Sequence, residues 1–346
     1  MSLFRRIRLL FGYYHWCLMA RKRFKLIVKS GGLMDPGLYY IVCATREYLI
    51  NTKTPYSFLK NISVPYSKPL ITLKIRERYN GGYKYRAQIA MTTNNGVRYF
   101  NYRDCTTYRC FSGPEESVQY GKAVELFSPY FKLTYIKHNT VACVEHVVKS
   151  RPRSEWNTTE ILRNYFFLFD RYTEYLNSTP KRSSILKIVD IVDDSKSLVL
   201  RLKELMPQMS LNYIFSHCDL HFGNTLFDGN DLFLIDFEES KEEVFFYDMF
   251  NVMYVDYMEY NNSFLLDKYL SGDAEMTKHF ERFFTGAGIR FEPKEKCGYL
   301  AVYLYLRLLF DLKTSKRKYE GEELEKRIAG YINNENEILT YILKWQ

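Results

Sequence analysis

One stretch of the sequence leaves little choice in how it can fold. Residues 215–238 read FSHCDLHFGNTLFDGNDLFLIDFE. The apolar residues that enter this stretch predict a strand. The apolar residues on either side of the DGND turn predict a hairpin, because Asp-Gly steps readily reverse the chain. A polar loop with His217, Asp219 and Asn224 therefore lies between a strand and a hairpin that ends at Asp236.

The polar side chains of this loop fit phosphoryl transfer from a nucleotide. That reaction needs a carboxylate to orient the acceptor hydroxyl and take its proton, and oxygen ligands to hold Mg²⁺ against the phosphates. Asp219 suits the first task. Asn224 and Asp236 suit the second, because Mg²⁺ prefers carbonyl and carboxylate oxygens to sulfur. Taken alone, His217-x-Asp219 would more often be a buried hydrogen-bonded pair, but the spaced Asn and the second Asp favour the catalytic interpretation.

This ordered set resembles the catalytic loop and metal-binding strand of the aminoglycoside phosphotransferase and choline kinase superfamily, relatives of the protein kinases. The resemblance implies that Asp219 is the catalytic base, that His217 stabilises the loop, and that ATP and Mg²⁺ are the cofactors. It implies that Asn224 and Asp236 bind the metal and that Asp248 is a buried brace for the loop. The implied fold is a two-lobed α+β protein-kinase-like fold, with a mainly β amino-terminal lobe and a mainly helical carboxy-terminal lobe.

Neighbouring positions refine the resemblance. Cys218 stands where the family usually has glycine, and a small residue is tolerated there. Glu238 is common in small-molecule kinases of the superfamily, whereas protein kinases have glycine at that position. Few residues separate Asp236 from Asp248, which leaves no visible activation segment and disfavours a protein kinase. His221 is expected to be part of the loop or a substrate contact, not a metal ligand.

The pattern of apolar residues changes from strand-like to helical along the chain. Strands are predicted at 70–77, 83–92, 97–103, 131–137 and 141–148. An Asn-Gly step at 95–96 predicts a hairpin between two of them. Helices are predicted near 37–48 and at 115–127, 155–176, 195–207 and most of 244–346. We expect three parts: an extension at 1–65, a β lobe at 66–147 and a helical lobe at 148–346.

The amino-terminal lobe matches the family less closely. Asn80-Gly81-Gly82 is the candidate for the phosphate-covering turn, with an ordinary hairpin turn as the alternative. The nucleotide-binding lysine of the third strand is not clearly present; Arg103 is the nearest cation, and Glu116 is its expected carboxylate partner on the following helix. The rival helix carboxylates are Glu115 and Glu125. Glu145 ends the fifth strand, where the family's inter-lobe hinge contacts adenine through backbone groups.

The net charge of +9 belongs to one end of the chain. Residues 1–30 hold eight Lys and Arg and no Asp or Glu, which leaves 41 basic against 40 acidic residues elsewhere. A nucleic-acid partner is therefore not expected. Apolar residues recur there at three- and four-residue steps: Leu3, Phe4, Ile7, Leu10, Phe11, Tyr14 and Leu18. They predict an amphipathic helix that either lies on an anionic membrane surface or docks on the body of the protein.

Cysteine usage and hydropathy indicate the compartment. The seven Cys are dispersed and include no C-x-x-C pair, which is typical of a reducing environment rather than of a disulfide framework or a zinc site. No run reaches the length of a transmembrane helix. We expect a cytoplasmic protein, peripheral at the inner membrane if the basic helix binds lipid.

The function predicted from these observations is ATP- and Mg²⁺-dependent phosphorylation of a hydroxyl on a small molecule or a sugar. Residues 30–40 resemble a short segment that accompanies bacterial surface-polysaccharide enzymes, which favours a glycan acceptor in polysaccharide or lipopolysaccharide biosynthesis. The alternative acceptor is choline, another amino alcohol or an aminoglycoside. The acidic residues of 238–243 could attract such a cation, and a solvated turn explains these residues equally well. A pseudokinase that serves as a binding module is the alternative class, and its support is the missing lysine.

Overall fold

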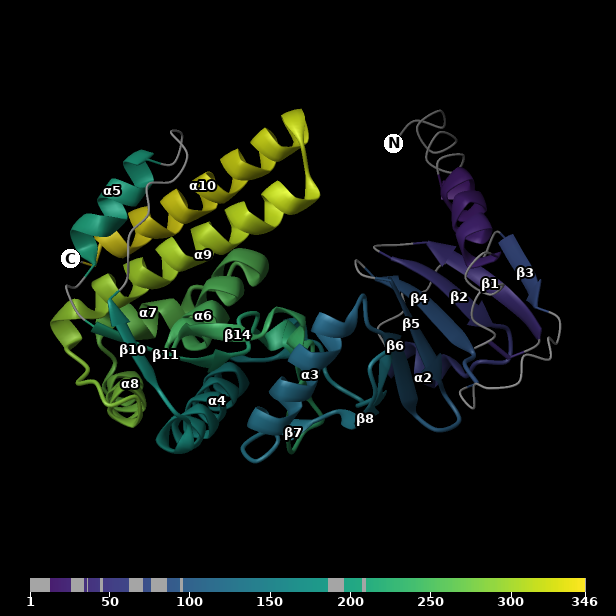
Figure 1. Ribbon diagram of the computed structural model, residues 1–346, viewed down its shortest axis with the longest axis horizontal. Helices are drawn as coiled ribbons and strands as arrows, with labels where there is room; N and C mark the ends of the chain where they lie inside the picture. The colour runs from purple at the N-terminus through teal and green to yellow at the C-terminus, as the bar shows by residue number, and fades with distance from the viewer. Residues whose placement is uncertain are drawn as a thin grey trace. The chain divides into compact units, whose positions relative to one another are not determined.

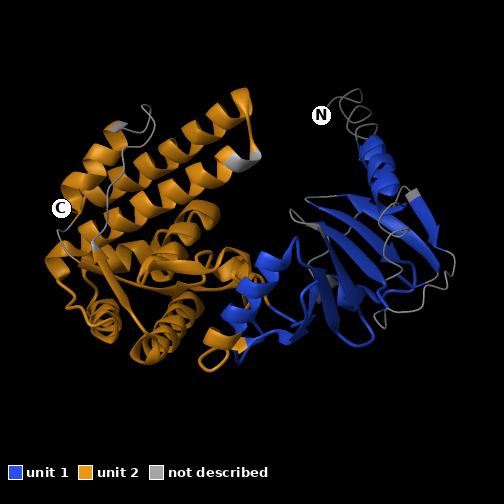
Figure 2. Ribbon diagram, in the orientation of Figure 1, with its two compact units in different colours: residues 1–124, 133–150, 226–233 blue, residues 125–132, 151–225, 234–346 orange. Residues whose placement is uncertain are grey.

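The computed structural model of the chain contains two compact units (Figure 1). The described residues are 13–25, 34–35, 37–43, 46–61, 71–75, 86–93, 96–185, 196–206 and 210–345. Unit 1 comprises residues 1–124, 133–150 and 226–233, and unit 2 comprises 125–132, 151–225 and 234–346 (Figure 2). Strands dominate the amino-terminal part and helices the carboxy-terminal part, so the predicted mixed α and β composition is confirmed.

Unit 1 is built on an eight-stranded sheet in the order β3-β1-β2-β4-β5-β6-β9-β8, with every neighbouring pair antiparallel. Its strands are β1 (Gly37–Cys43), β2 (Glu47–Asn51), β3 (Ile71–Ile75), β4 (Ile89–Thr93), β5 (Gly96–Asn101), β6 (Thr106–Cys110), β8 (Tyr135–His138) and β9 (Ala142–His146). Helix α2 is Tyr56–Asn61, and α3 is Pro114–Phe127. Thr93 pairs with Gly96 between β4 and β5, which confirms the hairpin predicted from the Asn-Gly step.

The helix expected near residues 37–48 is wrong, because this segment forms β1 and β2. The two strands pair from Tyr39 with Asn51 to Cys43 with Glu47. Residues 38–43 (LYYIVC) are aromatic or β-branched at most positions, which favours a strand over a helix. The sheet therefore contains strands on both sides of the boundary predicted between residues 65 and 66.

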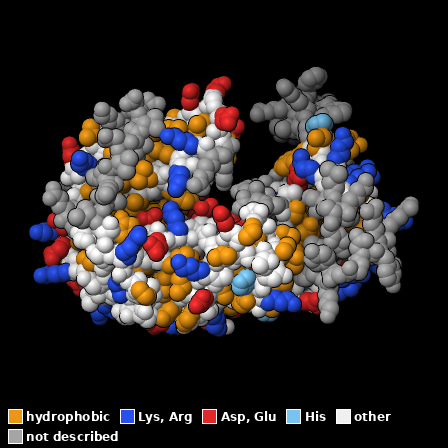
Figure 3. All heavy atoms as spheres, in the orientation of Figure 1, with side chains coloured by type: hydrophobic (Ala, Val, Ile, Leu, Met, Phe, Trp, Pro, Cys, Tyr) orange, Lys and Arg blue, Asp and Glu red, His pale blue; other side chains and the backbone are white. Residues whose placement is uncertain are grey.

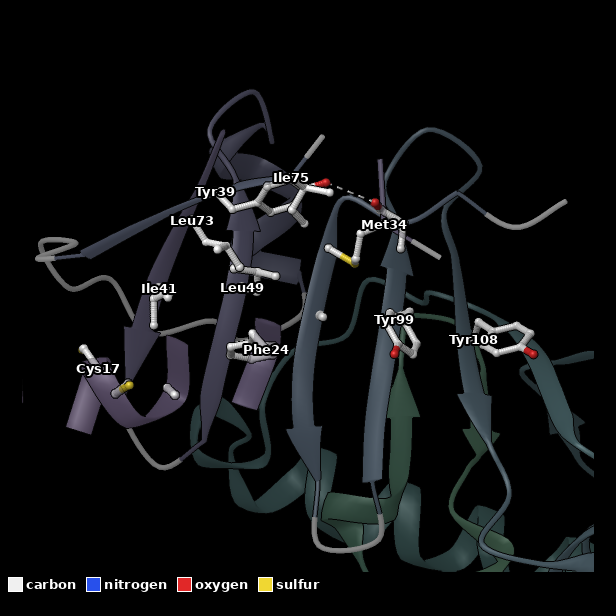
Figure 4. Packing of buried hydrophobic residues seen from close by; sticks show 14 of the residues in the cluster. Cys17, Phe24, Met34, Tyr39, Ile41, Leu49, Leu73, Ile75, Tyr99 and Tyr108 are labelled. Carbon is white, nitrogen blue, oxygen red and sulfur yellow. Dashed lines mark hydrogen bonds between the residues drawn. The ribbon is translucent and has the colours of Figure 1, made fainter. Parts of the chain in front are cut away.

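A basic helix covers one face of this sheet. Residues 13–25 are helical, and Cys17, Ala20 and Phe24 are buried with no exposed surface. Figure 4 shows Cys17 and Phe24 among side chains of the sheet such as Ile41 and Leu49. Of the two alternatives for the terminal helix, the burial of Cys17, Ala20 and Phe24 shows docking on the body of the protein. The buried stripe differs from the predicted one, since Tyr14 is 46% exposed, and residues 1–12 lie outside the described residues.

Unit 2 is mainly helical, as the periodicity beyond Pro152 predicts. Its helices are α4 (Thr158–Ser178), α5 (Lys196–Leu205), α6 (Tyr247–Tyr260), α7 (Phe264–Ser271), α8 (Ala274–Gly286), α9 (Lys296–Lys318) and α10 (Gly321–Leu343). A three-stranded sheet joins β10 (Arg182–Ile185), β11 (Ser210–Ser216) and β14 (Lys241–Val244) in that order. The last turn of α3 also belongs to unit 2.

Between β11 and β14 the chain makes the loop and hairpin predicted from the sequence. The short elements are η3 (Phe222–Asn224), β12 (Thr225–Phe227), β13 (Leu232–Leu234) and η4 (Phe237–Glu239). A third short strand, β7 (Lys132–Leu133), follows β13 in the sheet order. Two further single turns are η1 (Arg153–Glu155) and η5 (Pro293–Glu295).

Aromatic side chains make the core of unit 2. Phe250 of α6 packs against Phe280 of α8 and Tyr303 of α9, and Phe246 stacks on Phe284. Every residue of α6 from Tyr247 to Asp256 is buried, so this helix lies at the centre of the unit. The aromatic surplus of the composition therefore fills this core. Among the described helices none combines the length and the apolar character needed to cross a bilayer.

Candidate active site

A buried aspartate on α6 holds the loop that follows β11. Asp248 has no exposed surface, and its carboxylate accepts the backbone N–H groups of His217 and Cys218, each at 2.8 Å. Tyr172 of α4 donates its hydroxyl to the same carboxylate at 2.5 Å. Burial raises the pKa of Asp248, and these hydrogen bonds oppose the rise. The bracing role predicted for Asp248 is confirmed by this geometry.

The loop turns at Cys218 through a conformation that glycine adopts more easily. Cys218 has φ of 64°, in the left-handed region, and is completely buried. A residue with a Cβ is strained there, which explains why glycine suits this position. Burial raises the pKa of the Cys218 thiol well above its ordinary value, so the thiol stays protonated and is unsuited to nucleophilic chemistry.

Asp219 presents a partly exposed carboxylate at the end of this braced loop. Its side chain is 39% exposed. The buried Asn224 donates from Nδ2 to the Asp219 backbone oxygen at 2.8 Å and to Oδ2 at 2.9 Å. The backbone N–H of Ile235 donates to the Asn224 carbonyl at 3.1 Å, which fixes Asn224 against the end of β13. The structure thus brings Asp219 and Asn224, which the sequence placed in one loop, into direct contact.

His217 ties the loop to the residues before Asp236. Its Nε2 lies 2.8 Å from the carbonyl oxygen of Ile235, and its ring packs against Phe237 with 5.2 Å between centroids. His217 is completely buried, so its position is structural, in agreement with the expected role in loop stability. Asp236 itself has φ of 69° where the chain leaves β13. Such strained backbone at an aspartate is typical of a functional position.

His221 shapes the loop next to Asp219. Its Nδ1 accepts the backbone N–H of Gly223 at 3.1 Å, and its Nε2 lies 3.9 Å from Asp219 Oδ2. Burial lowers the pKa of His221, which favours the neutral ring that an accepting Nδ1 requires. A Cβ on Gly223 would lie 2.7 Å from the His221 ring, so only glycine allows this arrangement.

A second buried support, which sequence reasoning missed, reaches the loop from α6 and α9. Asn251 donates to the backbone oxygen of Leu220 at 2.9 Å, and its Oδ1 accepts the Tyr303 hydroxyl at 2.7 Å and an Arg307 N–H at 3.1 Å. Arg307 pairs with Asp311 at 3.0 Å. The only sign of this support in the sequence is the apolar run of α9, which charged residues interrupt at helical spacing. That pattern does not reveal that Arg307 contacts Asn251, 56 residues away.

Carboxyl groups of the terminal helices are buried beside this support. Glu335 of α10 has no exposed surface, and burial raises its pKa well above the ordinary value. The nearby charge of Asp311 adds to this rise, and the Arg307 guanidinium opposes it. Burial also raises the pKa of Asp311, for which Asp219 is one of the facing charges.

In unit 1 the structure pairs Glu116 with Arg109 and not with Arg103. The hairpin β4–β5 is followed by β6 and then by α3, and Arg109 of β6 lies 3.7 Å from Glu116 of α3. Their side chains are only 6% and 11% exposed. Arg103 lies in the turn after β5, is 65% exposed, and pairs with Asp35 at 3.8 Å. The rivals Glu115 and Glu125 are exposed on α3.

Glu145 of β9 is a buried side chain in the same part of unit 1. It accepts the Tyr120 hydroxyl at 2.9 Å and is 4% exposed. The backbone N–H groups of the next two residues, His146 and Val147, donate to Thr134 and Cys105 within unit 1. The predicted phosphate-covering turn at 80–82 lies outside the described residues.

The oxygen donors of Asn224 and Asp236 fit a magnesium ion. Asn224 uses its Nδ2 to hold Asp219, and its Oδ1 accepts no hydrogen bond from the described residues. In the described part of the chain no group of three or more His, Cys, Asp or Glu side chains is placed to hold a metal. A site with two protein oxygens suits Mg²⁺, because this ion keeps waters and substrate phosphates as its other ligands.

Comparison with known proteins supports a relation to phosphotransferases over part of the chain. Residues 170–279 match the model of the phosphotransferase enzyme family. No curated protein matches. Similar solved structures include a choline/ethanolamine kinase family protein from Mesorhizobium loti (11% identity, 74% of this chain and 88% of that chain, TM-score 0.41). Others are the choline kinase LicA from Streptococcus pneumoniae (13%, 71% and 90%, 0.41) and a glucosamine kinase (9%, 74% and 76%, 0.44). The matched family segment begins in α4, ends in α8 and contains the whole braced loop with Asp219.

Proposed function

We propose that this chain is a kinase that transfers a phosphoryl group from ATP to a hydroxyl of a small molecule. The observation that carries the proposal is the partly exposed Asp219 carboxylate, held by Asn224 on a loop that Asp248 fixes from below. A carboxylate that is partly exposed and held in one orientation can act as a general base toward an acceptor hydroxyl. The family match over residues 170–279 supports the same chemistry.

In this proposal each residue of the loop has a separate task. Asp219 orients the acceptor hydroxyl and takes its proton as the oxygen attacks. Asn224 keeps the Asp219 carboxylate in place through Nδ2 and offers Oδ1 to the metal, together with the Asp236 carboxylate. Bound Mg²⁺ would neutralise charge on the nucleotide phosphates. His217 and Asp248 act only by holding the loop.

Unit 1 offers a cation for the phosphates at Arg109. Its side chain is 6% exposed and lies 3.7 Å from the Glu116 carboxylate of α3. The support for the pseudokinase alternative is the missing lysine, and Arg109 beside Glu116 offers a cation in its place, so we favour the enzyme.

The proposal is tested by acceptor profiling with labelled ATP, followed by Asp219→Asn on the acceptor found. We expect turnover to fall by about 10²-fold or more, the usual scale for removal of a positioned base. Glu275→Gln, an exposed carboxylate of α8, is the matched control and should keep full activity. Unchanged turnover in the Asp219→Asn protein would refute the assignment of the base.

Nucleotide binding is tested separately by thermal shift with ATP, with and without Mg²⁺. A ligand at 100 times its dissociation constant stabilises the folded state by about 2.7 kcal/mol. The shift should require Mg²⁺ and disappear in Asp236→Ala. The absence of a shift with any nucleoside triphosphate would favour the binding-module alternative.

For the acceptor, we propose a sugar of a bacterial surface glycan. The support is the resemblance of residues 30–40 to a segment that accompanies polysaccharide enzymes. The acidic residues after β13 offer less attraction for a cationic acceptor than their number indicates, since Glu242 pairs with Arg182 at 3.1 Å and Glu243 with Lys241 at 3.4 Å. Transfer to choline or an aminoglycoside but to no sugar would contradict this choice.

We also propose that the basic helix of residues 13–25 faces an anionic membrane. Hydrophobic and basic side chains gather together over this helix (Figure 3), and Tyr14 and Met19 are 46% and 39% exposed. Deleting the segment would remove buried core residues, so Lys22→Gln with Lys25→Gln is the sharper test. These variants should weaken sedimentation with anionic vesicles, whereas Lys278→Gln with Lys294→Gln should not. Equal binding by both proteins would refute the membrane proposal.

A further inference from the structure

Unit 1 contains a polar pocket at one end of its sheet, which none of Asp219, Asn224 and Asp236 lines. The pocket, called here the strand-end pocket, has a volume of about 430 Å³. It lies where β1 and β4 begin and β2 and β5 end, and these four strands are neighbours in the sheet. The lining residues used below are Asp35, Asn51, Lys53, Arg86, Gln88 and Arg103. Its volume is within the range of small-molecule sites.

Buried side-chain amides give the strand-end pocket a fixed polar floor. Gln88 is 2% exposed; it donates to the Asp35 carboxylate at 2.8 Å and accepts the backbone N–H of Tyr102 at 3.0 Å. Asn51 is 7% exposed and accepts the backbone N–H of Lys53 at 2.9 Å. These bonds join three separate segments of the chain, so the floor does not depend on mobile surface side chains.

Gly37 allows the backbone to approach this floor. A Cβ at Gly37 would lie 2.9 Å from Nδ2 of Asn51, closer than real Cβ atoms come to such a neighbour. Gly37 and Asp35 belong to the short segment at residues 30–40 that the proposed catalytic chemistry does not use. The segment therefore has a structural consequence of its own, which is to shape this pocket.

The charges of the strand-end pocket do not balance. Arg103 lies 3.8 Å from Asp35, which compensates one positive charge with the pocket's single carboxylate. Lys53 and Arg86 are exposed, and neither forms an ion pair with another described residue. Among the described residues, two cations thus face the pocket without a counter-charge, beside the Asn51 amide.

We propose that the strand-end pocket binds an anionic, hydroxylated small molecule that carries a phosphate or a carboxylate group. Lys53 and Arg86 meet the anionic group, and Arg is well suited to it because its planar fork matches both phosphate and carboxylate. Asn51 faces the hydroxyl groups, and Gln88 holds the floor beneath them through its bonds to Asp35, Arg86 and Tyr102. This inference concerns unit 1 alone and holds whether or not the chain transfers phosphate.

The test is calorimetric titration without nucleotide, using glucose 6-phosphate, glucuronate and inorganic phosphate as anionic probes and glucose as the neutral probe. Lys53→Gln with Arg86→Gln should weaken binding of the anion at least tenfold. Lys137→Gln with Lys149→Gln removes the same charge from exposed positions of unit 1 and should leave binding unchanged. The comparison of glucose 6-phosphate with glucuronate shows which anionic group the pocket prefers.

Two results would overturn the proposal. One is an equal loss of affinity in both double variants, because binding would then follow net charge and not the pocket. The other is failure of all three anions to bind at millimolar concentration. Asp219→Asn should bind the probe as the unaltered protein does, so failure here is distinguishable from failure of the proposed kinase activity.

Discussion

Cys218 allows the strain of the braced loop to be measured with a pair of substitutions. At its φ of 64° a residue with a Cβ is disfavoured by about 1–2 kcal/mol, whereas glycine is not. Cys218→Ala and Cys218→Gly both remove the buried thiol, so the loss of its packing cancels when the two are compared. Glycine adds conformational entropy to the unfolded chain, which costs about 0.4–1 kcal/mol. The glycine variant should therefore be the more stable by about 0.5–1 kcal/mol.

The assay is urea unfolding of both proteins, with the free energy of unfolding taken from midpoint and slope. Cys297 provides the control in the same unit. It is buried in the first turn of α9 and is not among the residues with positive φ. There alanine should be the more stable by about 0.5–1 kcal/mol, the ordinary order in a helix. If alanine is also the more stable at Cys218, the backbone at that position is not strained and the explanation for glycine is wrong.

Three further substitutions test the buried polar groups of unit 2. Arg153→Met should destabilise the fold by about 3–5 kcal/mol in urea unfolding, because it leaves Asp256 buried without the bonds from Arg153 at 2.7 and 2.8 Å. Adding Asp256→Leu should recover most of that loss. If stability does not recover, the argument from a buried unpaired charge is wrong. Asn251→Leu should cost about 2–4 kcal/mol, since the Leu220 carbonyl and two donors lose their partner, and a loss under about 1 kcal/mol would show that water replaces it. Because burial raises the pKa of Glu335, the folded state keeps this proton to higher pH than the unfolded chain, and its contribution to stability falls as the pH rises above 4.5. Glu335→Gln should therefore gain in stability relative to the unaltered protein as the pH rises above 4.5 in urea titrations, and a difference that does not change with pH would contradict it.

The braced loop was predictable because its signals are local. The spacing of His217, Asp219, Asn224 and Asp236 lies within a strand, a loop and a hairpin that short-range propensity already defines. The brace by Asp248 followed from the resemblance. Neither Tyr172 nor Asn251 could be found in the same way, since each meets the loop through tertiary packing.

The arginine that pairs with Glu116 was missed for a different reason. Locating the third strand of the family required the order of strands in the sheet, and β1 and β2 were expected to be a helix. The assignment therefore fell on Arg103, in the turn before β6, whereas Arg109 lies within β6 and pairs with Glu116. The two residues lie six positions apart, and the turn at 102–105, which contains Arg103, is visible only in the structure.

The two aspartates of the loop should separate function from stability. Asp248 has no exposed surface and accepts three hydrogen bonds, whereas Asp219 is 39% exposed and accepts its side-chain bond from Asn224. Asp248→Ala should cost about 2–5 kcal/mol, because two backbone N–H groups and a tyrosine hydroxyl are left buried without an acceptor. Asp219→Asn should change stability by less than about 1 kcal/mol, the scale of a single exposed bond. Urea unfolding of both proteins measures the contrast. A comparable loss of stability at Asp219 would mean that this carboxylate holds the loop together, and the argument that it is free to meet an acceptor would fail.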